Sequence, residues 1–141
     1  MCNNQRHGLL VNTGQRLMLR NNVFANNKEY PMHVDGAKVR SIVNWESAQP
    51  YNVRTQDWTM IGNVVFSINR SLFTLPNWQH FFDTLYSNDN VWHARKTDKL
   101  FGLGREGNLT YLTLKDWRQQ IKNDHDSHIT MPINLSQPTC Q

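Results

Sequence analysis

The sequence predicts an all-β solenoid, in which short parallel strands from successive coils of the chain stack on one another. Three observations predict this class: an asparagine-rich unit that recurs, an interval of 23 residues between two similar strands, and an unusual abundance of asparagine. Recurrence at intervals of tens of residues is typical of repeat architectures, because each repeat adds one unit to a continuous stack.

The recurring unit is a short apolar strand followed by asparagines and an aromatic residue. Its three copies fall within residues 17–27, 60–66 and 86–92. Superposing their aromatic residues aligns three positions of the unit: Asn21 with Asn63 and Asp89, Val23 with Val65 and Val91, and Phe24 with Phe66 and Trp92. We therefore expect the aligned residues to stack in successive coils.

Spacing and asparagine content indicate the shape of each coil. Leu9 and Met32 lie in similar strands 23 residues apart, which is the length of one turn of a three-sided parallel β-helix. Asparagine fills 17 of the 141 positions. It suits tight turns because it tolerates left-handed backbone angles and bonds its own backbone. Asparagines at equivalent turns of successive coils can also form side-chain amide ladders.

Two segments in the middle of the chain have contrasting patterns. Residues 37–44 alternate small or apolar residues with polar ones, which predicts a strand. Residues 45–56 are polar and include Pro50, which predicts a loop inserted into the coil. Trp58 follows this loop, and its expected role is core packing or anchoring of the loop.

The end of the chain has the pattern of a capping element. Further short strands are expected at residues 100–103 and 109–112, around a turn at residues 102–104. In residues 113–121, apolar side chains recur at helical spacing, which predicts an amphipathic helix with Thr113 as its N-cap. Because the last coil of a solenoid exposes strand edges and core, it needs such a cap.

Length and composition set the outer bounds. The 141 residues allow one domain, and we expect coils in about residues 8–112 and a cap in residues 113–133. No apolar run approaches the roughly 18 residues needed to cross a bilayer, so no membrane partner is expected. The formal charge is +4. Its basic residues are scattered and do not interleave with aromatic ones on one stretch, so no nucleic-acid partner is expected either.

The two ends of the chain carry further expectations. Cys2 and Cys140 are expected to be free thiols rather than an end-to-end disulfide, although the sequence leaves that pairing open. Residues 1–6 lack the apolar segment of a secretory signal peptide.

Two stretches resemble the C-terminal part of the right-handed parallel β-helix proteins, a family of polysaccharide lyases, epimerases and glycoside hydrolases. One is the unit RNNVFANN at residues 20–27. The other is the Leu-x-x-Trp helix at residues 114–119, followed by Asp124, Ser127 and then Pro132. The resemblance covers about residues 8–133, where Asp124 and Ser127 are expected to be turn and cap groups. It implies a short right-handed parallel β-helix with a C-terminal capping helix. Family members usually have more coils, so we expect a C-terminal portion of an extracellular or cell-surface protein.

The resemblance implies carbohydrate chemistry, for which one coil supplies candidate residues. Lyases of uronic-acid polymers need a base for the C5 proton and cations for the developing charge. The candidate catalytic residues are His33, Asp35, Lys38 and Arg40. Lys38 and Arg40 alternate along the expected strand and so would share one face, which is either a binding face or a solvated one. His33 beside Asp35 is either an oriented base or a surface histidine in a turn.

Other residues leave the chemistry open. Trp45 and Tyr51 flank the expected loop and are candidates for stacking on sugar rings. A hydrolase would need two carboxylates, for which no pairing is apparent among Asp35, Glu46, Asp57 and Asp83. We expect no cofactor, although Ca²⁺ is possible if the chemistry is lyase-like. The function expected is action on an extracellular polysaccharide, lyase-like or hydrolase-like; the alternative is a non-catalytic glycan-binding or adhesin-like module.

Overall fold

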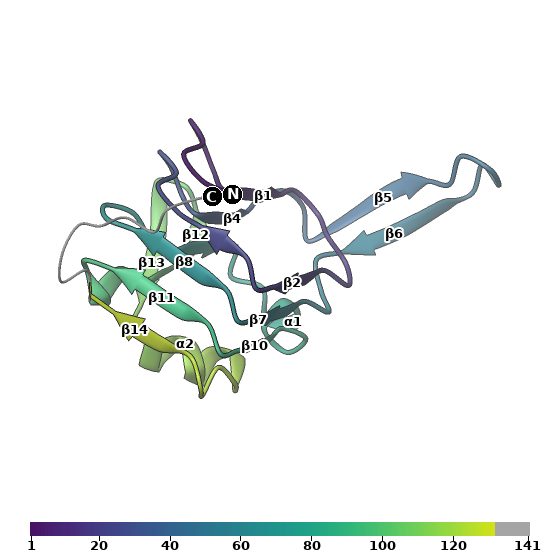
Figure 1. Ribbon diagram of the computed structural model, residues 1–141. Coiled ribbons are helices and arrows are strands. Elements are labelled where there is room, and N and C mark those ends of the chain that lie inside the picture. The colour runs from purple at the N-terminus through teal and green to yellow at the C-terminus, as the bar shows by residue number, and fades with distance from the viewer. Residues whose placement is uncertain (132–141) are drawn as a thin grey trace.

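The computed structural model describes residues 1–131, and these form a mostly β structure with 42% strand and 11% helix. The all-β class predicted from the sequence is confirmed at this level. Figure 1 shows a body of stacked strands from which one long hairpin projects.

Three sheets of stacked strands build the body (Figure 1). The first sheet has the order β1-β4-β9-β12-β13, with bounds Leu9–Val11, Met32–Val34, Phe73–Leu75, Phe101–Arg105 and Asn108–Leu112. The second has the order β10-β7-β2, with bounds Tyr86–Asn88, Thr59–Ile61 and Met18–Arg20. The third has the order β14-β11-β8-β3, with bounds His128–Thr130, Val91–Ala94, Val64–Ser67 and Val23–Phe24.

The chain visits the three sheets in the same order on each pass. The first pass supplies β1, β2 and β3, the second β4, β7 and β8, and the third β9, β10 and β11. A short helix, α1 (Gln79–Phe82), lies in the third pass. The last pass supplies β12, the antiparallel β13, helix α2 (Leu114–Ile121) and β14, with the 3-10 helix η1 (Thr97–Lys99) before β12. Strands at the same position in successive passes therefore pair in parallel.

The register confirms part of the alignment made from the sequence. Leu9 pairs with Met32, as the 23-residue interval predicts. In the third sheet the stacked pairs are Val23–Val64–Val91 and Phe24–Val65–Trp92. The first and third copies of the repeat are therefore aligned as predicted, but the middle copy is displaced by one residue. Phe66 does not point into the core with Phe24; its ring lies 4.9 Å from the ring of His93, its register partner.

Asparagine side chains form a buried ladder at the corner between the second and third sheets. The backbone N–H of Asn22 donates to Oδ1 of Asn63, and that of Asn63 donates to Oδ1 of Asn90. The backbone N–H of Asn90 donates to Oγ of Ser127, which ends the series. The predicted amide ladder is thus confirmed, but two members lie one residue after the predicted Asn21 and Asp89. Asn21 and Asp89 instead adopt left-handed backbone angles at the turn, as does Gly62 at the same place in the second pass.

The apolar faces of the sheets enclose an aromatic core. Trp58 is 1% exposed, and its Nε1 donates to the carbonyl of Gly14 at 2.8 Å, so the predicted core role is confirmed. Phe101 and Trp117 stack with ring centroids 4.4 Å apart. Since Trp117 belongs to α2, this stacking fixes the helix against the core.

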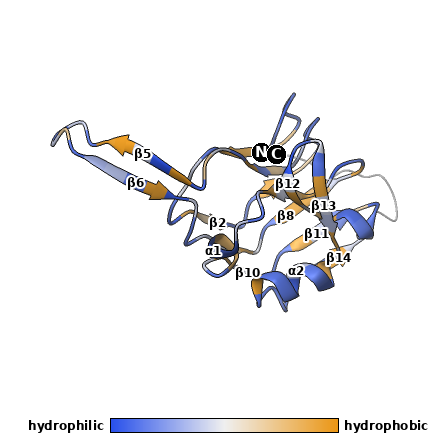
Figure 2. Cartoon of the chain, turned by 180° about the vertical axis from the view of Figure 1, so that it is seen from behind, coloured by the Kyte–Doolittle hydropathy of each residue, from blue (hydrophilic) through white to orange (hydrophobic). Residues whose placement is uncertain are grey.

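Helix α2 (Leu114–Ile121) covers the core at the last pass of the chain, as predicted. Thr113 is its N-cap and forms a capping box with Asp116. The helix is largely hydrophilic in Figure 2, and its buried residues are Leu114, Trp117 and Ile121. After it, the buried carboxylate of Asp124 accepts from the hydroxyls of Ser87 and Ser127, which confirms the predicted turn and cap roles. Pro132, the last residue of the expected closing motif, lies outside the described residues.

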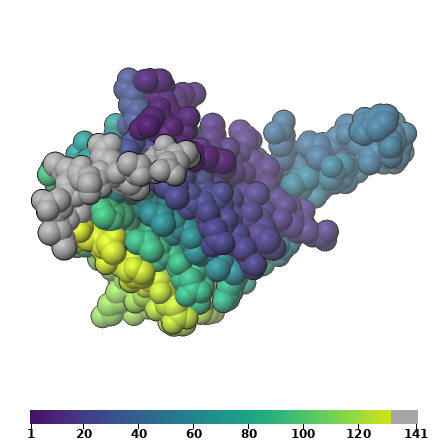
Figure 3. All heavy atoms as spheres, in the orientation of Figure 1, coloured from purple at the N-terminus to yellow at the C-terminus, as the bar shows by residue number. Residues whose placement is uncertain are grey.

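The prediction of a loop at residues 45–56 is wrong, because most of these residues belong to a β-hairpin. Strands β5 (Val39–Val43) and β6 (Pro50–Arg54) pair antiparallel and project from the body as an arm (Figures 1 and 3). At the tip, Oδ1 of Asn44 accepts from the backbone N–H groups of Glu46 and Ser47, which makes the turn. Pro50 is tolerated because it begins its strand.

Two other expectations are corrected. The turn between β12 and β13 lies at residues 106–107, not at 102–104. Gly107 has a φ of 87°, which suits a tight turn, whereas Gly102 lies within β12. Cys2 is disulfide-bonded, so the expectation of a free thiol at this end is wrong. Cys140 lies outside the described residues.

Candidate functional site

The outer face of the first sheet carries a row of residues in register across neighbouring strands. His33 pairs with Leu10 on one side and with Thr74 on the other, and Thr74 pairs with Gly102. A Cβ atom at Gly102 would lie 3.0 Å from Cγ2 of Thr74, so a larger residue at this position would crowd the neighbouring strand. Hollows lie beyond both ends of these strands.

The first hollow, the His33 groove, has a volume of about 480 Å³. Its lining residues come from the ends of β4 and β12 and from the segments after β4 and β9: His33, Val34, Asp35, Gly36, Pro76, Trp78, Gly104, Arg105 and Glu106. Because the carboxyl ends of parallel strands meet at one edge of a sheet, three passes of the chain contribute to one groove. It holds a histidine, two carboxylates, a guanidinium and an indole ring.

His33 is held in place from two sides. Its Nδ1 lies 2.6 Å from Oγ1 of Thr74, and its ring stacks on His7 at 4.7 Å and on Tyr30 at 5.5 Å. His7 is fixed in turn, since its Nε2 lies 2.9 Å from Oε2 of Glu29. These contacts leave the imidazole of His33 one orientation at the wall of the groove.

Burial lowers the pKa of His33 below its ordinary value of 6.5, and the neighbouring His7 lowers it further. The carboxylates of Asp35 and Glu106 act in the opposite direction. Desolvation disfavours the charged imidazolium, so His33 is neutral at neutral pH. A neutral, oriented imidazole is the form that accepts a proton.

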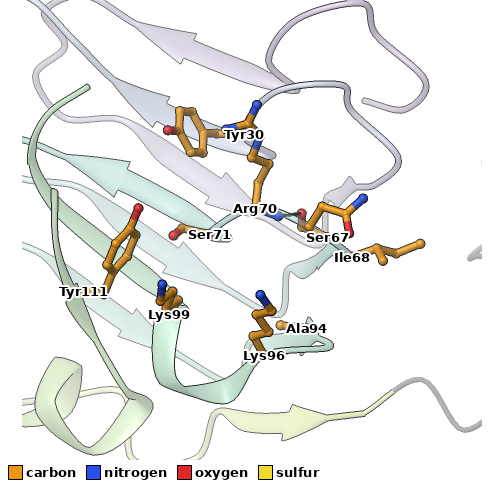
Figure 4. Close-up of a pocket in the computed structure, with 10 residues that line it drawn as sticks. Tyr30, Ser67, Ile68, Arg70, Ser71, Ala94, Lys96, Lys99 and Tyr111 are labelled. Carbon is orange, nitrogen blue, oxygen red and sulfur yellow. Dashed lines mark hydrogen bonds between the residues drawn. The ribbon is translucent and has the colours of Figure 1, made fainter. Parts of the chain in front are cut away.

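The second hollow, the cation pocket, lies at the opposite end of the same strands and has a volume of about 160 Å³. Three basic side chains line it, Arg70, Lys96 and Lys99, and Figure 4 shows them reaching it from different segments. Tyr30 and Tyr111 also line it. Tyr30 therefore connects the pocket to the groove, because it also stacks on His33.

The candidate catalytic residues predicted from the sequence divide between two places. His33 and Asp35 lie together in the His33 groove. Lys38 precedes β5, and Arg40 pairs with Val53 inside the arm, so neither lines the groove. Lys38 lies one residue before β5 and Arg40 lies within it, so their sharing of one strand face stays a prediction. Gly36, with a φ of 90°, turns the chain at this point and directs it from the sheet into the arm.

The candidate stacking residues also lie on the arm. Trp45 is at its tip and is 88% exposed, and Tyr51 is in β6 and is 50% exposed. Their role in binding a sugar stays a prediction. Both side chains lie outside the groove that holds His33.

The sequence-based reasoning missed Trp78, Arg105 and Glu106 in the groove, and all three cations of the pocket. One signal could have located several of them. Arg70 and Lys99 come shortly before strands of the first sheet, and Arg105 ends one of those strands. Once the strands are stacked in register, residues at such positions lie at shared edges of the sheet.

The residues described form no cluster of carboxylates of the kind that is prominent in calcium sites. Ca²⁺ takes six to eight oxygen ligands, with carboxylates prominent among them. Within residues 1–131, no three His, Cys, Asp or Glu side chains are close enough to hold a metal ion. The groove has two carboxylates, and the guanidinium of Arg105 lines it with them.

Comparison with known protein families, with curated proteins and with solved structures finds no significant match. Function is therefore inferred from the residues and geometry of this chain. In the described part of the chain, no helix is long and apolar enough to cross a bilayer.

Proposed function

We propose that the protein is a short right-handed parallel β-helix that acts on an extracellular polysaccharide, by lyase-type cleavage next to a uronate in the His33 groove. The observation that carries the proposal is the shared lining of this groove: neutral His33, Arg105 and Trp78 face the same 480 Å³ space. This reaction needs a base for the C5 proton and a cation for the uronate carboxylate, and the indole ring of Trp78 adds a surface on which a sugar ring can pack.

The β-helix assignment is supported by three sheets, parallel apart from the β12–β13 pair, that the chain visits in the same order on its first three passes. Crossover connections between parallel strands are nearly always right-handed, which favours a right-handed coil.

In the proposed reaction, His33 removes the proton on C5 of the uronate. The C5–H electron pair becomes the C4=C5 double bond, and the bond from C4 to the bridging oxygen breaks. The leaving oxygen gains a proton, so the net change is transfer of one proton from C5 to that oxygen, without addition of water. Arg105 binds the uronate carboxylate and stabilises the negative charge that develops on it.

The test is turnover of uronate and neutral polysaccharides by the full chain, with detection of the unsaturated product. We expect His33→Gln to lower kcat/KM by about 100-fold or more, which is the usual contribution of a general base. His93→Gln is the matched control, because Nδ1 of His93 likewise lies 2.5 Å from a threonine hydroxyl, that of Thr130, but in the third sheet. Absence of turnover on the whole panel, or equal losses in both variants, would contradict the proposal.

The pH dependence follows from the lowered pKa of His33. Because the imidazole must be neutral to accept a proton, kcat/KM falls as the pH falls through that pKa, and the midpoint lies below 6.5. Asp35→Asn removes a charge that raises this pKa, so it moves the midpoint to still lower pH. A midpoint above 6.5 in the unmodified protein would contradict the role of His33 as the base.

The second candidate is a glycan-binding module without catalysis, which the exposed aromatic residues of the arm favour. Trp45 is 88% exposed at the arm tip and lies outside the groove that holds His33. Saturable binding of an oligosaccharide without any product would support this candidate. New reducing ends without an unsaturated product would instead indicate hydrolysis by the two carboxylates of the groove, Asp35 and Glu106.

A further inference from the structure

We infer that the cation pocket binds a compact oxyanion, a sulfate ester or a carboxylate carried by a sugar. The identity of the carrier as a glycan rests on the proposed function, but the recognition of the anion does not. The proposal gives Arg70, Lys96 and Lys99 a role in anion binding, which is separate from the reaction proposed for the groove.

The first argument is uncompensated charge. Three basic residues line the pocket and none of its lining residues is acidic. Within residues 1–131, both ion pairs are formed by Glu29, with Arg6 and with His7. A cavity lined by one sign of charge raises the local concentration of the opposite charge.

The second argument is that the cations are positioned without being neutralised. The guanidinium carbon of Arg70 lies 5.9 Å from the ring centre of Tyr30, and Nζ of Lys99 lies 5.0 Å from that of Tyr111. Contact with a ring face holds a cation in place while leaving its N–H donors free for another partner. In Figure 4, Arg70 extends beside Tyr30, and Lys99 lies near Tyr111.

The third argument is the backbone geometry around Arg70. The backbone N–H of Arg70 donates to Oγ of Ser67 at 3.0 Å, and Ser67 is 7% exposed. This bond closes the turn that presents the guanidinium to the pocket. Ser71, which is 5% exposed, adds a hydroxyl to the same wall. The pocket therefore combines a planar guanidinium, two ammonium groups and hydroxyl donors, which together match the oxygens of a sulfate or carboxylate.

Size and position narrow the ligand. A volume of about 160 Å³ takes a small anionic group rather than a whole oligosaccharide. Tyr30 separates this group from His33, whose ring is 5.5 Å away. A glycan with one residue in the groove can therefore place an anionic substituent of a neighbouring residue in the pocket, so the pocket selects charged over neutral polymers.

The test is calorimetric titration of the full chain with galactose 6-sulfate, galacturonate, galactose and sodium sulfate. We expect both anionic sugars to bind at least tenfold more tightly than galactose, with affinity that falls as salt rises. Lys96→Gln with Lys99→Gln should remove at least a factor of ten. The matched control is Lys115→Gln with Lys122→Gln, which removes two charges from the surface of α2 and should leave the affinity unchanged.

Each outcome separates the sources of the anion. Tighter binding of the sulfated sugar assigns the pocket to sulfate esters, and tighter binding of galacturonate that is lost in the Lys96→Gln, Lys99→Gln double variant assigns it to carboxylates. Equal affinity for free sulfate and galactose 6-sulfate would show that the pocket takes the ion without the sugar, which would overturn the glycan part of the proposal. Equal loss of affinity in both double variants, or equal affinity for galactose and for the anionic sugars, would overturn the proposal that the pocket binds an anion. Affinity for galactose 6-sulfate reports on the pocket, and turnover of uronate polymers reports on the groove, so failure of the groove and failure of the pocket are distinguishable.

Discussion

The asparagine ladder and the cation pocket are both rich in polar groups, yet they differ in how those groups are satisfied. In the ladder, Asn63 and Asn90 are fully buried, and both amides are bonded to neighbouring passes of the chain. In the pocket, Arg70, Lys96 and Lys99 are exposed to solvent and form no ion pair with any described residue. Polar groups that bond one another hold the passes in register, whereas groups left open are available to a ligand.

The ladder should be the most sensitive part of the molecule, and Asn63→Ala is its sharpest test. Removing this amide takes away the side-chain partner of the Asn22 backbone N–H and of the Leu19 carbonyl, and one of the two donors to Oδ1 of Asn90, so we expect a loss of roughly 3 to 5 kcal/mol in the free energy of unfolding. Chemical denaturation measures this loss. Asn52→Ala, at an exposed position of the arm, is the control and should change stability little. Similar values for both variants would remove the distinction between ladder and surface.

The buried carboxylate at the end of the ladder should have a smaller effect. Asp124 accepts from two serine hydroxyls and from Nε1 of Trp92. Asp124→Asn keeps a residue that tolerates the φ of 73° but replaces one acceptor with a donor, so we expect a loss of about 2 kcal/mol. Thermal or chemical unfolding gives the value. A change within experimental error would mean that the closing turn does not depend on this charge.

The cap of α2 should contribute less again. Thr113→Ala removes the N-cap bond to Asp116 and should cost about 1 kcal/mol, with Thr110→Ala as the exposed control. Hydrogen bonds from Thr113 lower the pKa of Asp116, so their contribution is present above the ordinary pKa of 3.8 and is lost as the pH falls through the lowered value. Unfolding curves measured from neutral to acid pH should therefore show a smaller acid loss in Thr113→Ala than in the parent. An unchanged acid loss would contradict this assignment.

The arm should matter least for stability. Trp45 is 88% exposed, so Trp45→Ala should change the free energy of unfolding by no more than about 0.5 kcal/mol. If the arm contacts the glycan, the same variant lowers oligosaccharide affinity in the titration. Unchanged affinity would remove Trp45 from the binding residues, and a large loss of stability would show that the arm tip packs on the body.

Parts of the fold could be predicted because they depend on local patterns. The 23-residue interval gave the Leu9–Met32 register, and helical spacing with Thr113 gave α2. The predicted alignment of the middle repeat was off by one residue because Val64, Val65 and Phe66 are all apolar. Alternation alone therefore does not say which of them points inward. The arm was missed because Pro50 and polar neighbours hide a strand whose partner is local and whose faces are both exposed.

The site was less predictable, because it is assembled from distant passes. His33 and Asp35 could be predicted from the sequence because they lie two residues apart. Arg105 and Glu106 join them only when β4, β9 and β12 are stacked. Arg70, Lys96 and Lys99 look like scattered surface charges until the same stacking brings them around one pocket. Their positions next to strand ends become informative only when the strands are stacked in register.

The uneven spacing of the strands has a practical consequence for engineering. Paired positions in the first sheet are separated by 23 residues from Leu9 to Met32, by 41 from Met32 to Phe73 and by 28 from Phe73 to Phe101. The additional chain leaves the body between β4 and β7 as the arm. This junction is therefore a natural place to exchange one peptide for another, and the body can serve as a scaffold for displaying foreign sequences.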